Sequence, residues 1–158
     1  MQNLSLPVMN AGLFEEVANW FCGLPHCRTI GLEFVNGERG RATMRVPYNT
    51  ALVGNPRSGV LHGGVITSLI DTCSATAVAA HLEDFETIAT LDLRIDYLKP
   101  ATPGRTIYCT AECYRFASQI AFTRAVCYHD SIDDPIAHGI ATFMRGSSST
   151  PMLPEGAS

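Results

Sequence analysis

The chain has 158 residues, of which 46% are hydrophobic and 16% are charged, a composition that fits one globular domain with a sizeable core. Its formal net charge is −4 and it contains no run of basic residues, which argues against a surface for binding nucleic acid.

Six cysteines are spread along the chain without any CxxC pair, so a zinc ribbon is not expected. The N-terminus lacks the basic region and long apolar segment of a signal peptide. We therefore interpret all six cysteines as reduced core residues of a cytoplasmic protein. The histidines His81, His129 and His138 form no pair at ligand spacing, so we expect no metal, and no cofactor is indicated.

The first part of the chain predicts a loose arm, a short helix and a hairpin. Residues 1–10 are interpreted as the arm, and residues 11–22 have the apolar spacing of a helix that Gly23 and Pro25 end. Residues 29–47 read as two strands around an Asn36-Gly37 turn, because Asn-Gly is a strong hairpin signal. Residues 48–59 form a polar, turn-rich segment.

The segment from Leu61 to Leu82 is apolar or small almost throughout and has the length of a helix of five to six turns. A membrane span is rejected because Asp71 lies near its centre and several hydroxyl side chains dilute its hydrophobicity. A helix rich in Ala, Ser, Thr and Cys instead indicates close packing against a sheet.

Asp71 and the helix start are the candidate chemical groups of this segment. A lone carboxylate in an apolar helix is costly to bury, because desolvation disfavours its ionised form. Gly63 and Gly64 allow a ligand to approach the first helical amides, which have no intrahelical partner and carry the positive end of the helix dipole. Such a pair suits acyl transfer or hydrolysis, although Asp71 could instead be a structural residue that bonds a neighbouring loop.

Four strands joined by short connections follow, over residues 87–103, 105–116, 120–129 and 135–145. Consecutive strands with short turns pair antiparallel, so we expect an α+β fold in which about five or six antiparallel strands curl around the central helix. In the first strand, alternation places Leu91, Leu93, Ile95 and Tyr97 on one face, and Thr90 with Asp92 and Arg94 on the other. We divide the chain into an arm and short helix (1–27), the main domain (28–146) and a disordered tail (147–158).

Four stretches together resemble the hotdog-fold acyl-CoA thioesterases of the PaaI-like, phenylacetate-degradation type. They are Asn55 in the loop, the sequence His62-Gly63-Gly64, Asp71 nine residues after that histidine, and TLDLRIDYLKPA from Thr90 to Ala101. The likeness covers roughly residues 28–145.

The resemblance implies hydrolysis of an acyl-CoA thioester at a site shared by two subunits of a homodimer or homotetramer. The Gly63 amide would polarise the thioester carbonyl, and Asp71 would act as nucleophile or general base. Thr90 would help to place the water, and Asp71 and Thr90 of one chain would face Gly63 and Asn55 of the other. His62 could act as a base or could hold the helix start by a hydrogen bond.

Gly64 and four basic residues are the candidates for substrate binding. The basic residues could hold the phosphates of coenzyme A or could be solvated surface charges; they are Arg94, Lys99, Arg115 and Arg124. Two other functions stay open: an acyl-CoA-binding module without chemistry, and a hotdog hydratase or dehydratase. We expect neither a nucleic-acid partner nor a membrane partner.

Overall fold

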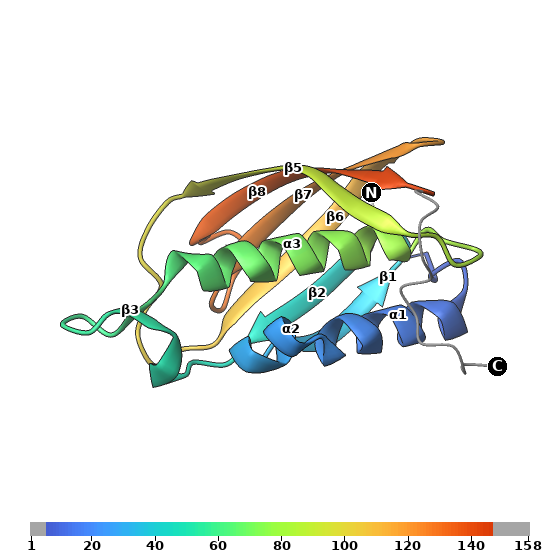
Figure 1. The fold of residues 1–158 in the computed structure, drawn as a ribbon. Helices are drawn as coiled ribbons and strands as arrows, with labels where there is room; N and C mark the ends of the chain where they lie inside the picture. The colour runs from blue at the N-terminus through green and yellow to red at the C-terminus, as the bar shows by residue number, and fades with distance from the viewer. Residues whose placement is uncertain (1–5, 147–158) are drawn as a thin grey trace.

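The computed structural model describes residues 6–146, in which a single curled sheet surrounds one long helix (Figure 1). The sheet has six strands in the order β1-β2-β6-β7-β8-β5, and every neighbouring pair is antiparallel. The predicted α+β hotdog architecture is therefore confirmed. The strands of this sheet are β1 (Glu33–Glu38), β2 (Arg41–Val46), β5 (Ile88–Tyr97), β6 (Ile107–Phe116), β7 (Ile120–Tyr128) and β8 (Ala137–Arg145).

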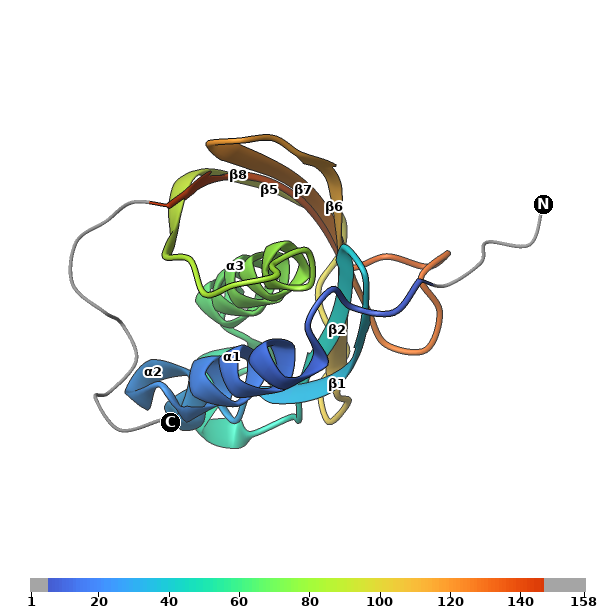
Figure 2. The same ribbon diagram turned by 90° about the vertical axis from the view of Figure 1, so that its right-hand side faces the viewer.

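The central helix α3 (Gly63–Ala79) lies in the concave face of the sheet, as Figure 2 shows from the end of the helix. Its small side chains allow the close approach that the composition predicts. The Cys73 thiol reaches the carbonyl oxygens of Ala42 and Cys109 at 3.4 and 3.3 Å, and Ile70 packs so tightly on Gly139 that a Cβ there would lie 2.5 Å from it. We call the concave side of the sheet its inner face and the opposite side its outer face.

Two further helices, α1 (Ala11–Gly23) and α2 (Pro25–Ile30), lie beside α3 on the β1 side of the sheet. Pro25 opens α2, where a missing amide hydrogen costs nothing, and Gly31 ends it with a positive φ of 71°. The prediction that a strand begins at Thr29 is wrong, since Thr29 and Ile30 belong to this helix.

The first hairpin turns at Arg39-Gly40, so the predicted Asn36-Gly37 turn is wrong as well. Gly40 has a φ of +70°, which suits a glycine in a turn. Gly37 lies inside β1, where a Cβ would come within 2.4 Å of the Phe14 ring. This glycine therefore serves the close packing of α1 on the sheet and not a change of chain direction.

The pairing of β5 with β8 contains a bulge at Leu91, because Thr90 pairs with Phe143 while Asp92 pairs with Thr142. Phe143 is buried on the inner face, so Thr90 also turns inward, and the expectation from simple alternation that it shares a face with Asp92 is wrong. Leu91, the extra residue, is 53% exposed.

The described part of the N-terminal arm is bonded to the domain. The Met9 amide donates to the Ala80 carbonyl, the Leu6 carbonyl accepts from the Arg39 amide, and Asn10 caps α1. The interpretation of these residues as a loose arm is therefore wrong. Residues 1–5 and the predicted tail at 147–158 lie outside the described residues.

All six cysteines are free thiols; five are buried and Cys22 is half-buried. Burial raises the pKa of the Cys113 thiol to about 11 and raises the pKa of Cys109 as well.

None of the helices within residues 6–146 combines the length and the hydropathy needed to cross a membrane.

Candidate active site

The start of α3 has an amide that is free to bind a ligand. His62 is the N-cap residue, and its Nδ1 accepts a hydrogen bond of 2.9 Å from the Gly64 amide. This is the structural role that the sequence left open as one of two for His62. The preceding amide, that of Gly63, has no acceptor among residues 6–146.

Asp71 lies two turns further along the helix, and its carboxylate is half-buried. Burial raises the pKa of this carboxyl above its ordinary value, and a hydrogen bond from the Thr90 hydroxyl to Oδ1, 2.9 Å long, partly opposes the rise. The β5 bulge directs Thr90 toward the helix and so creates this contact. The structure thus brings together Asp71 and Thr90 within one chain.

Gly63 and Asp71 are too far apart in one chain to act on one carbonyl group. Eight residues of α-helix span roughly 12 Å along the helix axis, whereas both groups would need to lie within about 3 Å of the reacting atoms. One chain by itself therefore holds two half-sites at different levels of the same helix.

Asn55 lies in the hairpin that leads into α3, where its neighbour Gly54 packs on His62: a Cβ at Gly54 would lie 2.7 Å from the His62 Cα. Asn55 ends the short strand β3 (Val53–Asn55), which pairs with β4 (Val60–Leu61) after the 3-10 turn η1 (Thr50–Leu52), and this hairpin projects from the domain (Figure 1). The Asn55 side chain is exposed and accepts a hydrogen bond from the Arg57 amide. Within residues 6–146 it forms no hydrogen bond with His62 or Asp71.

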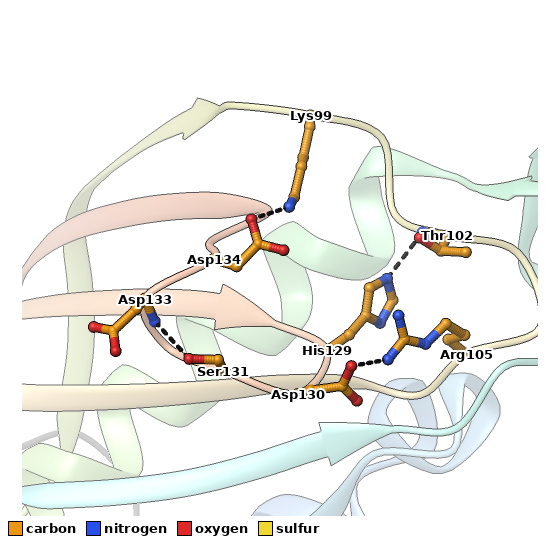
Figure 3. Close-up of polar contacts among 8 residues, drawn as sticks. All are labelled: Lys99, Thr102, Arg105, His129, Asp130, Ser131, Asp133 and Asp134. Carbon is orange, nitrogen blue, oxygen red and sulfur yellow. Dashed lines mark hydrogen bonds and ion pairs between the residues drawn. The ribbon is translucent and has the colours of Figure 1, made fainter.

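The basic candidates for substrate binding are dispersed. Arg94 and Arg124 lie on the outer face, away from Asp71, where they pair with Asp96 at 3.1 Å and Glu112 at 2.8 Å. Lys99 lies in the loop after β5 and pairs with Asp134 of the loop after β7 (Figure 3). Arg115 is exposed near the end of β6.

The outer face also has a hollow of about 420 Å³, lined in part by Arg41, Glu112, Arg124 and His138. The sheet separates it from Asp71 and Gly63, so it is no part of the candidate site. Within residues 6–146, no three His, Cys, Asp or Glu side chains are grouped as metal ligands.

Sequence reasoning missed Tyr97, whose hydroxyl donates a hydrogen bond of 2.9 Å to the Gly63 carbonyl. The alternation of β5 places Tyr97 on the helix side of the strand, which marks it only as a packing residue. Its contact with the helix start depends on how far β5 extends along α3, and a single sequence does not reveal that register.

Comparison with known proteins adds a second line of support. Residues 58–135 match the thioesterase superfamily. The medium/long-chain acyl-CoA thioesterase YigI of Salmonella typhimurium is 32% identical over 136 residues, which span 78% of this chain and 86% of the relative.

Solved structures agree. A Pseudomonas aeruginosa protein of known crystal structure is 44% identical, with a TM-score of 0.76 over 84% of this chain and 98% of its own. The PaaI protein of the E. coli phenylacetic acid degradation operon aligns with a TM-score of 0.73 over 85% of this chain and 94% of its own; at 19% identity it supports the fold alone.

The curled sheet, the buried helix and the glycine-rich helix start define a hotdog-fold thioesterase. The chain belongs to the thioesterase superfamily, and the resemblance to its acyl-CoA thioesterases that the motifs indicated is confirmed.

Proposed function

We propose that this protein hydrolyses acyl-CoA thioesters to a free acid and coenzyme A, with Asp71 as the catalytic carboxylate and the Gly63 amide as the carbonyl-polarising donor. The observation that carries this proposal is the Thr90–Asp71 pair, in which a half-buried carboxylate of α3 accepts a hydrogen bond from a single hydroxyl of β5. The same helix α3 has a free amide at its start. A structural aspartate that bonded a neighbouring loop would have loop partners, and Asp71 has none among residues 6–146.

The proposed chemistry uses each group once. The Gly63 amide, at the positive end of the helix dipole, donates to the thioester oxygen and stabilises the negative charge that develops there. Asp71 either attacks the carbonyl carbon or removes a proton from the water that attacks it. The C–S bond then breaks, and the coenzyme A thiolate takes up a proton. With Asp71 as general base the acid forms in this step; with Asp71 as nucleophile, water then hydrolyses the acyl–Asp71 anhydride, which releases the acid and regenerates the carboxylate. Thr90 stabilises the ionised carboxylate and helps to place the water.

Because one chain separates Gly63 from Asp71, the proposed site is completed by a second copy of the chain. A helix α3 that runs antiparallel beside the first would set the partner's Gly63 next to Asp71, and the two half-sites of each chain would form two equal sites. Asn55, exposed on its projecting hairpin, would reach the neighbouring subunit and not its own.

The acyl group is proposed to be of medium or long chain length. The support comes from relatives named medium/long-chain acyl-CoA thioesterases, which align over most of this chain. Gly64, Lys99 and Arg115 remain proposed contacts of the substrate. Arg94 and Arg124 lie on the outer face of their own chain, so they remain proposed contacts only for coenzyme A bound at the site of a neighbouring subunit.

The test is the variant Asp71→Asn, which keeps the shape of the side chain and removes its basic and nucleophilic character. Release of free thiol from acyl-CoAs of graded chain length should slow by about 10²–10⁴-fold, the usual size of a general-base contribution. Acyl-CoA affinity, measured by calorimetry, should change little. Hydrolysis at the wild-type rate would remove Asp71 from the mechanism and favour a binding module.

A further inference from the structure

The start of α3 is built from two consecutive glycines, which makes it the least constrained turn of the helix. Glycine has more backbone freedom than any other residue, and the first turn of a helix lacks half of its hydrogen bonds. An amide that stabilises a developing charge is effective only if it is already oriented. His62 supplies two supports: its Nδ1 accepts from the Gly64 amide, and its carbonyl, which shares a peptide unit with the Gly63 amide, accepts from the Val65 amide at 3.0 Å. Rotation about Gly63 itself still requires a support from outside the helix.

Tyr97 supplies this support from the sheet. Its hydroxyl donates to the Gly63 carbonyl at 2.9 Å and lies 3.0 Å from the Thr67 hydroxyl, which itself donates to the same carbonyl at 3.3 Å. Two hydroxyl groups thus converge on one carbonyl oxygen, which has two lone pairs to accept them. The Tyr97 ring also covers Gly63, since a Cβ at that position would lie 3.3 Å from the hydroxyl oxygen.

The carbonyl of Gly64 is also bound by a hydroxyl group, which in turn contacts a residue of α2. The Ser68 hydroxyl donates to the Gly64 carbonyl at 2.9 Å and contacts His26 Nε2 at 2.8 Å. The first turn of α3 is therefore fixed between β5 and α2. Of these two neighbouring elements, only β5, through Tyr97, forms a hydrogen bond with Gly63.

We propose that Tyr97 is a positioning residue: by binding the Gly63 carbonyl it holds the peptide unit that follows Gly63, limits rotation about this glycine, and so keeps the Gly63 amide oriented for carbonyl polarisation. This inference rests on the proposed function, because it assigns Tyr97 a role through Gly63. In this role Tyr97 acts through Gly63 and not through a contact with the thioester or the attacking water. Its removal should weaken the chemical step and leave acyl-CoA binding unchanged.

The test is Tyr97→Phe, which keeps the ring over Gly63 and deletes only the hydroxyl. Displacing a catalytic group by a fraction of an ångström to one ångström costs up to about 10²-fold, so we expect kcat to fall roughly 10-fold to 100-fold with an unchanged KM. The matched control is Tyr114→Phe, since Tyr114 is 51% exposed, as Tyr97 is 52% exposed, but lies on β6 without a hydrogen bond from its hydroxyl among the described residues.

A spectroscopic readout separates positioning from general destabilisation. Acyl-CoA carrying a ¹³C-labelled carbonyl is bound to Asp71→Asn, which turns it over slowly, and its carbonyl stretch is recorded by infrared difference spectroscopy. Adding Tyr97→Phe should shift the stretch to higher frequency, because the bond is less polarised. At Thr67, a Val substitution should produce a smaller shift in the same direction, and a Ser substitution should restore the original frequency.

Wild-type kcat and an unmoved carbonyl stretch in Tyr97→Phe would overturn the role of Tyr97. If Gly63→Val loses activity in the same series, the proposed function stands without a role for Tyr97. If a folded Gly63→Val protein turns over normally, the amide is not the donor, and the proposed roles of Gly63 and Tyr97 both fall.

Discussion

The ionised form of Asp71, which the proposed chemistry requires, is the form that burial makes unfavourable for the folded protein. Removing its carboxylate from water disfavours the charged form, and the Thr90 hydroxyl compensates only in part, so the pKa of Asp71 is raised. A folded-state pKa above the unfolded value of 3.8 means that the folded protein holds this proton more tightly than the unfolded chain does. The stabilising effect is complete below pH 3.8 and is lost as the pH rises through the folded-state pKa.

Asp71→Asn should therefore raise the melting temperature at neutral pH, and the gain should be larger at pH 8 than near pH 4. Each kcal/mol of stabilisation corresponds to about 2–4 °C for a domain of this size. Thermal melts across this pH range test the prediction, with Asp92→Asn as the control, since Asp92 lies exposed on the outer face of β5. A gain that does not vary with pH would contradict the burial argument.

At the scale of elements, β5 connects the two half-sites. Thr90 near its start binds Asp71, and Tyr97 at its end binds the Gly63 carbonyl, so one strand contacts α3 beside both proposed catalytic groups. This strand is also the edge of the sheet, beside β8 on one side only. Its loop to β6 is held by His129, whose Nε2 accepts a hydrogen bond of 2.9 Å from the Thr102 amide (Figure 3). The Nδ1 of the same ring therefore donates to the Thr106 carbonyl at 2.8 Å.

His129→Ala should cost about 0.5–1.5 kcal/mol of unfolding free energy, because it removes two hydrogen bonds of this loop whose backbone groups water can reach. Hydrogen exchange at the Thr102 amide should accelerate, and urea denaturation should show the loss of stability. His138→Ala is the control, since His138 is exposed on the outer face. Equal stability of the two variants would show that the loop does not depend on the His129 ring.

The sequence predicted the elements that depend on local sequence patterns and missed the features that depend on contacts between residues distant in sequence. Alternation and turn residues predicted the four C-terminal strands, and the small apolar side chains predicted the central helix and its place against the sheet. The Asn36-Gly37 signal failed because Phe14, distant in sequence, needs the space that Gly37 leaves. The Leu91 bulge and the Tyr97 contact depend on pairing with β8 and on register along α3, which no local pattern encodes.

At the scale of the whole molecule, the separation of Gly63 from Asp71 makes self-association part of the proposed chemistry. Two inactive variants should then complement each other. In a mixed dimer of Asp71→Asn and Gly63→Val chains, one site combines the intact Asp71 of one chain with the intact Gly63 of the other, and the second site has both defects. Co-expressed chains should regain thiol release that neither variant shows alone.

Sedimentation of the same samples should show at least a dimer. A monomer that hydrolyses acyl-CoA would contradict the shared site. Mixing the separately purified variants without subunit exchange is the control, since it leaves every dimer with the same defect at both sites.

The burial of the cysteines has a practical consequence for all of these measurements. A reagent that detects the coenzyme A thiol reacts with thiolates, whereas five of the protein's own six sulfurs are buried, and burial raises the pKa of Cys22, Cys109 and Cys113. The folded enzyme should therefore contribute almost no colour of its own. Each chain that unfolds would expose its five buried thiols at once, so a rise of the background signal would measure denatured protein, separately from turnover.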